Sequence, residues 1–224
     1  MAALIDLPDA CRLRANLAHI RRHIDDAAHR AGRRDGSEVR LLAATKYVAT
    51  HQMPLLAHAS VHLVGENRAQ DLLAKASLYE DLFEYHFIGA LQSRKVRSIL
   101  PHVTLIHSVA SESALQQLAR HRHLARPGLE ILIEVNIARE PAKAGISPEQ
   151  LPRYLDLAPL PVAGLSCMAP LTQDPERSRP WFAALRELAR EHHLQTLSMG
   201  TSQDYPVAVE EHATIVRIGT NLYS

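Results

Sequence analysis

Lys46 occupies a position at which a lysine could form a covalent bond with a substrate or cofactor. It ends the first strongly apolar run of the chain, residues 39–46, and it is one of four lysines set against twenty-one arginines. An amine can lose its proton and attack a carbonyl carbon, whereas a guanidinium cannot. A coding bias toward arginine explains this ratio but not the position, because the carboxyl end of a strand is the usual seat of chemistry in barrels and doubly wound sheets. The sequence therefore predicts a carbonyl-binding amine at this strand end.

Two turns late in the chain have the composition of a phosphate site. One is Gly200-Thr201-Ser202, which precedes a helix-like stretch, and the other is Gly219-Thr220, just after Arg217. The loops after strands seven and eight are where barrel enzymes most often hold phosphate, and helix N-termini favour anions. Taken alone, the composition of each segment is typical of an ordinary turn that binds no ligand. Together with Arg217 and Lys46 they indicate a phosphorylated aldehyde held as a Schiff base, either a sugar phosphate, as in an aldolase, or pyridoxal 5′-phosphate (PLP).

These residues must be positioned by an alternation of short and long elements. Eight short apolar, β-branched runs predict strands, at 39–45, 61–65, 84–89, 103–109, 129–136, 162–168, 196–200 and 214–219. The stretches between them predict helices, at 52–60, 66–78, 91–100, 112–124, 148–157, 177–193 and 204–212. A further helix, with an apolar stripe from Leu13 to Ala28, is predicted at 9–33 and ends near Gly32.

Eight strands separated by single helices favour one (β/α)8 TIM barrel preceded by an N-terminal helix, an α/β fold without a second β domain. The alternative is an open doubly wound sheet, which at this length would more often have fewer strands. We expect one domain over residues 1–224, with residues 1–36 forming a helix that packs on the barrel, because only five residues follow the eighth strand.

Composition excludes several classes of function. The chain has 224 residues and a net charge of +1, so no basic footprint for nucleic acid is present. No run is long enough to span a membrane, no leader is recognisable, and Cys11 and Cys167 form no CxxC pair; a cytoplasmic protein is expected. His19 and His23 have the spacing of two metal ligands on a helix, but charged neighbours indicate a solvated face, and we expect no metal.

Further motifs surround the candidate residues in a fixed order. They are Ala44-Thr45-Lys46, Gly65-Glu66-Asn67, His86-Phe87-Ile88-Gly89-Ala90-Leu91-Gln92, Asn136-Ile137 with Glu140, Lys143-Ala144-Gly145-Ile146, Gly164-Leu165, Met168-Ala169-Pro170, Leu197-Ser198-Met199-Gly200 with Ser202 and Asp204, and Val216-Arg217-Ile218-Gly219-Thr220. In this order and spacing the chain resembles the YggS/PROSC family of PLP homeostasis proteins over nearly its whole length. That family is similar to the barrel domain of alanine racemase and bacterial-type ornithine decarboxylase, without their second, β-rich domain.

The resemblance implies a role for each matching residue. Lys46 would hold PLP covalently as a Schiff base, Asn67 would lie near its phenolic oxygen, and Arg217 would face its pyridine nitrogen. The implied phosphate site consists of Ser202 and the segments around it, that is Met199, Gly200, Thr201, Gly219 and Thr220. The chain departs from the family pattern at Arg94, where asparagine is usual, at Thr201, where methionine is usual, and at His212, where glycine is common.

The resemblance implies a carrier of PLP with little or no catalysis, which stores, buffers or delivers the cofactor. PLP-dependent apoenzymes would be its recipients, and we expect a monomer. A PLP-dependent amino-acid enzyme such as a racemase is the alternative, but related racemases take a second acid/base from the β domain that is missing here. Of the remaining candidates, Lys75 is expected to face solvent and Cys167 to lie in the core.

Overall fold

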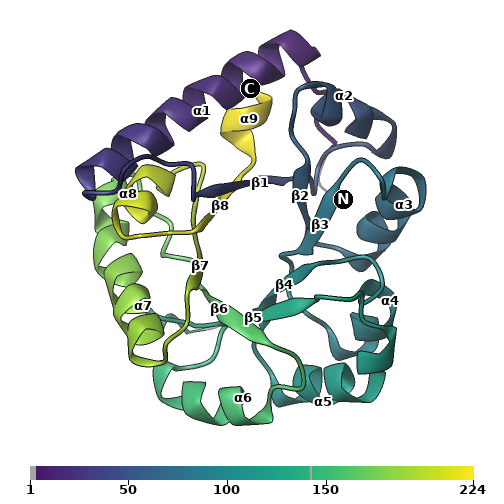
Figure 1. The fold of residues 1–224 in the computed structure, drawn as a ribbon, viewed down its shortest axis with the longest axis vertical. Helices are drawn as coiled ribbons and strands as arrows, with labels where there is room; N and C mark the ends of the chain where they lie inside the picture. Colours follow the sequence, from purple (N-terminus) through teal and green to yellow (C-terminus); the bar gives the residue numbers. More distant parts are fainter. Residues whose placement is uncertain (1–3, 142) are drawn as a thin grey trace.

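The chain forms a closed barrel of eight parallel strands surrounded by helices (Figure 1). The computed structural model describes residues 4–141 and 143–224. Each strand pairs with the next in chain order, and the eighth pairs with the first, as the sequence predicts. The strands are β1 (Arg40–Ala44), β2 (Leu63–Glu66), β3 (Glu84–Phe87), β4 (Leu105–Val109), β5 (Glu130–Glu134), β6 (Val162–Ser166), β7 (Thr196–Thr201) and β8 (Ile215–Ile218).

A ring of helices covers the outside of the barrel. These helices are α1 (Ala10–Arg30), α2 (Met53–His58), α3 (Ala69–Tyr79), α4 (Val96–Ile99), α5 (Glu112–His121), α6 (Leu151–Leu157), α7 (Arg179–Glu191), α8 (Tyr205–Glu210) and α9 (Thr220–Tyr223). Ser111 caps α5 by accepting a hydrogen bond from Ala114 N at 3.2 Å, as expected of a serine at this position. Within the described residues, no helix has both the length and the apolar character needed to cross a bilayer.

Helix α1 closes the outer layer over the last part of the chain. Asp9 caps its first turn by accepting a hydrogen bond from Arg12 N at 2.9 Å. The predicted apolar stripe is buried, with Leu13, Ile20 and Ile24 inaccessible or nearly so, and it packs against α8 and α9 (Figure 1). An N-terminal helix therefore precedes the barrel, as predicted, and it covers this part of the outer layer.

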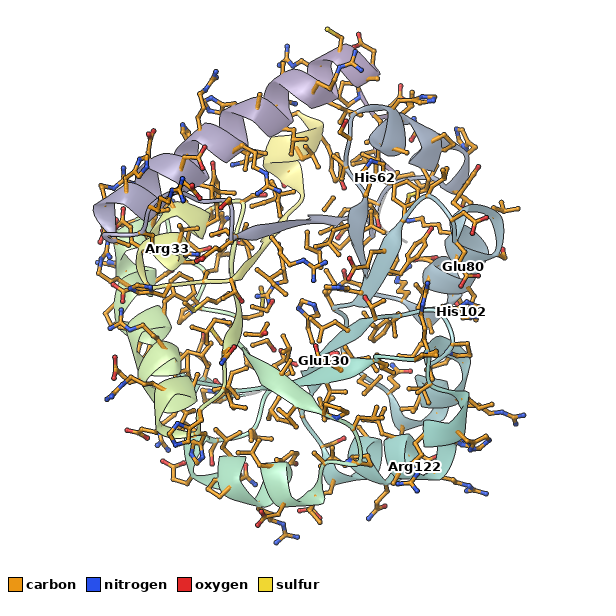
Figure 2. All side chains as sticks on the ribbon, in the orientation of Figure 1. Arg33, His62, Glu80, His102, Arg122 and Glu130 are labelled. Carbon is orange, nitrogen blue, oxygen red and sulfur yellow. The ribbon has the colours of Figure 1, made fainter. Side chains whose placement is uncertain are left out.

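Strand periodicity divides the core into two parts, one outside and one inside the barrel. The outer cluster lies between strands and helices, and the inner one contains Leu42, Leu105, Leu132 and Ile215. Figure 2 shows side chains from the strands filling the interior of the ring. Two residues further along the same four strands come Ala44, His107, Glu134 and Arg217, which line a cavity instead. Because alternate residues of a strand share a face, each interior-facing strand presents an apolar layer and then a more polar one.

The structure differs from the predicted elements mainly at their ends. The first half of the predicted helix 91–100 is an extended segment and a 3₁₀ turn, Ser93–Lys95, and only Val96–Ile99 is α-helical. Helix α9 was not predicted, because four residues are too short for a helical period. His212 has a φ of 67°, in the left-handed region that glycine adopts without steric cost, which explains why glycine suits this position.

Lys75 is buried, so the expectation that it faces solvent is wrong. Its Nζ donates to Glu66 Oε1 at 2.5 Å and to the carbonyl oxygen of Thr45 at 2.7 Å. Thr45 Oγ1 donates to the same carboxylate oxygen at 2.5 Å. Burial raises the pKa of Glu66, and the charge of Lys75 opposes that shift. The ion pair of Lys75 and Glu66 joins α3 to the ends of β1 and β2, next to the turn that carries Lys46.

We predict that Lys75→Ala lowers the free energy of unfolding by about 3–5 kcal/mol, because Glu66 would keep a buried charge without its partner. Urea denaturation followed by circular dichroism measures this loss. Lys143→Ala is the matched control, since it breaks a half-exposed ion pair with Glu140 and should cost at most about 1 kcal/mol. A similar small loss for both variants would mean that water reaches Glu66.

Candidate functional site

The carboxyl ends of all eight strands surround a cavity of about 530 Å³. Its size is in the range of small-molecule sites. Most of the expected site residues line it, namely Lys46, Asn67, Thr201, Ser202, Arg217, Gly219 and Thr220. Gly200 lines an adjoining cavity of about 370 Å³, which shares Glu134, Met168, Thr201, Gln203 and Arg217 with the first. Met199 lines neither, because its side chain is fully buried in the outer core.

Lys46 lies in a turn immediately after β1. Its side chain is exposed, and Nζ lies 4.8 Å from the ring centroid of Tyr47. The preceding carbonyl, Thr45 O, accepts hydrogen bonds from Val48 N at 2.9 Å and from the buried Lys75. Hydrogen bonds to Thr45 O therefore hold the backbone of this turn in place, while the amine remains accessible from the cavity.

Ser202 connects the two turns that were expected to bind phosphate. Its Oγ accepts a hydrogen bond from Gly219 N at 3.1 Å, and its carbonyl oxygen accepts one from Asn221 Nδ2 at 2.9 Å. These contacts bring the loop after β7 against the loop after β8, although seventeen residues separate Ser202 from Gly219. The Ser202 hydroxyl proton is left to donate into the cavity.

Asp204 holds the first of these turns in shape. Its Oδ1 accepts from both the amide and the hydroxyl of Thr201, at 2.7 and 3.1 Å, and its Oδ2 accepts from Ser178 Oγ at 2.9 Å. Gly200 has a φ of 88°, and a Cβ there would lie 2.6 Å from the Ala208 Cβ, so only glycine fits. The Thr201 amide, which belongs to one of the segments implied to bind phosphate, is thus engaged by Asp204 within the protein.

Arg217 is the buried charge of the cavity. Its Nη1 donates to Ser198 O at 3.0 Å and Ser198 Oγ at 2.8 Å, and its Nη2 contacts Cys167 O at 2.6 Å and Met168 Sδ at 3.1 Å. Burial lowers the pKa of Arg217 from its usual value, but a guanidinium stays charged in proteins. The charge of Arg217 in turn opposes the effect of burial on Glu134, the net result being a raised pKa.

The buried thiol of Cys167 is not a nucleophile. Burial is the largest effect on this thiol and raises its pKa to about 12, so the reactive thiolate is absent at neutral pH. The expectation that Cys167 belongs to the core is confirmed by its place in the outer cluster.

Two buried polar atoms on the cavity wall have no hydrogen-bond partner in the described part of the chain. They are Asn67 Oδ1 and Ser108 Oγ. Because unpaired buried polar atoms are costly, their presence on a cavity wall fits a polar ligand that satisfies them. Together with an amine, a hydroxyl and a guanidinium, they give the cavity both donors and acceptors for a polar ligand.

The sequence did not single out Tyr223 as a residue of the cavity. It comes from α9, lines the cavity, and donates from its hydroxyl to Ala44 O at 3.2 Å. Burial raises the pKa of Tyr223, so the phenol stays protonated. Since the last four residues carry no periodicity, only the position of Tyr223 after the eighth strand could have indicated it. Among residues 4–141 and 143–224, no group of three metal-binding side chains is present.

Comparison with known proteins agrees with this geometry. The family model described as alanine racemase, N-terminal domain, matches residues 9–224. The chain is 38% identical over 218 residues to the pyridoxal phosphate homeostasis protein of Aquifex aeolicus, covering 92% of this chain and 95% of that protein. It is 37% identical to the protein of the same name from Pseudomonas aeruginosa, with 93% of each covered.

A solved structure extends this likeness to three dimensions. PipY of Synechococcus elongatus, solved with PLP bound, superposes with a TM-score of 0.79 at 30% identity, covering 95% of this chain and all of PipY. The sequence, the barrel and its cavity thus point to the same group of proteins, and the chain belongs to the family of the alanine racemase N-terminal domain and the pyridoxal phosphate homeostasis proteins.

Proposed function

We propose that this protein binds PLP as a Schiff base on Lys46 and serves PLP homeostasis by storing, buffering or delivering the cofactor. One observation carries the proposal: a single cavity combines an exposed amine, a hydroxyl that joins two glycine turns, and a buried guanidinium. The names of the relatives from Aquifex and Pseudomonas and the PLP complex of PipY support it. When bound, PLP supplies an aldehyde that condenses with a primary amine, with loss of water.

Lys46 contributes the amine in this proposal. Its exposure lets a ligand and water enter and leave, which storage and delivery both need. Its turn is anchored through Thr45 to the buried pair of Glu66 and Lys75, so the amine projects from a fixed backbone. Rigid support of this kind reduces the entropy lost when the covalent bond forms.

The two turns joined by Ser202 would hold the phosphate. The Ser202 hydroxyl can donate to a phosphate oxygen, and the glycines at 200 and 219 let the backbone come close to an anion. Asn67 would contact the phenolic oxygen through its side-chain amide, which lies on the cavity wall. We propose that the barrel and its N-terminal helix form one domain, and that this domain provides all of these contacts.

Arg217 would donate a hydrogen bond to the ring nitrogen. A permanent donor leaves that nitrogen unprotonated, so the ring withdraws electrons less strongly from a reacting carbon. The titratable side chains of His107 and Glu134 also line the cavity. His107 has both of its ring nitrogens engaged in hydrogen bonds, so neither is free to act as a base. Glu134 lies on β5, which is opposite β1, the strand that leads to Lys46. We infer from this arrangement that the site holds PLP with little or no turnover and delivers it to PLP-dependent apoenzymes in the cytoplasm.

The first prediction from the proposed function concerns the covalent bond. Lys46→Ala should abolish the visible absorbance of the Schiff base and the adduct trapped by borohydride, because the amine is gone. Absorbance spectra and mass mapping of the reduced protein measure this. Lys95→Ala, which removes a half-buried amine outside the cavity, should leave both signals unchanged. An adduct on Lys75, Lys95 or Lys143 in the wild-type protein would disprove the assignment.

The second prediction concerns the phosphate. Ser202→Ala should weaken PLP binding by about 1.5–3 kcal/mol, the size of one hydrogen bond to a charged group. Titration with PLP and with pyridoxal, which lacks the phosphate, separates this contact from the rest of the site. Pyridoxal should bind both proteins equally weakly, and the control Ser77→Ala, on the exposed face of α3, should behave as wild type. Equal losses for PLP and pyridoxal would rule out a phosphate contact.

The third prediction concerns catalysis. The PLP-loaded protein in deuterated water should exchange the α-hydrogen of L-alanine far more slowly than about 1 per second, the lower end of ordinary enzyme rates. The reason is the ring nitrogen kept unprotonated by Arg217. Proton NMR follows both exchange and racemisation, with the Lys46→Ala variant as background. Fast exchange accompanied by racemisation would favour the racemase alternative.

A further inference from the structure

A chain of hydrogen bonds runs through the inside of the barrel from the cavity to its opposite end. Arg217 Nη1 donates to Ser198 Oγ at 2.8 Å, and Ser198 Oγ lies 2.8 Å from His107 Nδ1. His107 Nε2 lies 2.9 Å from His86 Nδ1, and His86 Nε2 lies 3.0 Å from Glu84 Oε1. We call these five residues the relay. The step from β4 to β7 joins strands that are not neighbours, so the relay crosses the barrel interior.

The relay is buried over most of its length. The exposed fraction is 0% for His86 and Ser198 and 2% for His107. The apolar residues Leu42, Leu105, Leu132 and Ile215 fill the rest of the barrel interior. Apolar side chains in place of the relay would have a lower desolvation cost. We therefore expect the buried polar chain to have a specific role.

The far end of the relay is an ionised carboxylate. Glu84 accepts hydrogen bonds from His86, from Arg40 Nη2 at 2.6 Å and from Thr104 Oγ1 at 2.8 Å. The hydrogen bond from His86 is the largest of several effects that hold the pKa of Glu84 well below its usual range. An ionised carboxylate can only accept hydrogen bonds, and a guanidinium can only donate them.

These two ends fix every hydrogen in between. Burial lowers the pKa of His86 and lowers that of His107 further, so both rings are neutral, with one donor and one acceptor each. His86 must donate to Glu84 and therefore accept from His107. His107 must then accept from Ser198, whose oxygen is left to accept from Arg217. A hydrogen-bond chain polarised in one direction strengthens each of its members.

We propose that Ser198 and His107 are positioning residues that hold the Arg217 guanidinium toward the ring nitrogen of bound PLP. His107 fixes the direction of the Ser198 hydroxyl, and the Ser198 oxygen then fixes Nη1 of Arg217. This inference rests on the proposed function, since it concerns the same cavity. If the relay only stabilised the fold, its loss would affect folding. It would not change the preference of the protein for a ligand with a ring nitrogen over a ligand with carbon at that position.

Two ligands test the inference directly. They are PLP and its 1-deaza analogue, in which a C–H replaces the ring nitrogen while the aldehyde, the phenol and the phosphate remain. The ratio of their dissociation constants isolates the contact to the ring nitrogen, and a change in protein stability cancels in this ratio. The wild-type protein should prefer PLP by about tenfold, the factor expected for one hydrogen bond.

Ser198→Ala should bring this ratio most of the way to one. The variant removes one of the two acceptors of Nη1 but leaves Arg217 its contacts with two backbone carbonyls and Met168 Sδ, so the barrel should still fold. His107→Leu, which leaves the Ser198 hydroxyl without its acceptor, should lower the ratio in the same direction. Melting temperatures and circular dichroism establish folding for each variant.

Ser166→Ala is the matched control, because it makes the same change at the same depth on the neighbouring strand β6. Ser166 Oγ donates to His107 O, and the hydrogen bonds of Arg217 in the described residues go to Ser198, Cys167 and Met168 instead. Its ratio should stay at the wild-type value. An unchanged ratio in Ser198→Ala, or an equal fall in Ser166→Ala, would overturn the inference.

Borohydride trapping separates this inference from the proposed function. If both ligands are trapped on Lys46 of the wild-type protein but bind equally well, the relay does not act on the ring nitrogen, and the proposed function stands. If neither ligand is trapped on Lys46, the proposed function fails, and the inference fails with it.

Discussion

The structure depends on one electrostatic constraint, a guanidinium inside a closed barrel. Arg217 cannot lose its charge, and a barrel interior offers only the acceptors that its own strands supply. β7 supplies a carbonyl and a hydroxyl from Ser198, and the segment after β6 supplies the Cys167 carbonyl and the Met168 sulfur. The carboxyl ends of β6, β7 and β8 are therefore held together around one charge, and Arg217 lines both of the adjoining cavities.

A second buried charge system supports the other side of the cavity. Lys75, Glu66 and Thr45 join α3 to the ends of β1 and β2, where the turn carrying Lys46 begins. Breaking either system would leave a charge buried without its partner, which costs far more than the loss of a surface ion pair. The two groups proposed to contact opposite ends of the PLP ring therefore each belong to a segment that is hydrogen-bonded within a buried charge system.

The sequence predicted the architecture better than the burial of charges. Eight short β-branched runs separated by helices identify a barrel, because strands differ from helices in hydrophobic periodicity and each run is bounded by turn residues. The burial of Lys75 could not be predicted in this way, because a helical pattern does not reveal that a carboxylate from β2 lies within hydrogen-bond distance of it. The engaged amide of Thr201 depends likewise on Asp204, three residues away in a turn whose shape comes from Gly200. Partners from other elements, not local periodicity, decide such contacts.

The same contacts that make the site rigid also restrict what it can do. An enzyme that removes a proton from an amino acid needs a ring that accepts electrons and a base that can move or change its charge. Here the donor proposed for the ring nitrogen is fixed in place, and His107 is held on both ring nitrogens by Ser198 and His86. The exposed Lys46 amine lies outside this network, 4.8 Å from the ring centroid of Tyr47. Reversible attachment of an aldehyde needs only an accessible amine, which is the chemistry that the proposed carrier role requires.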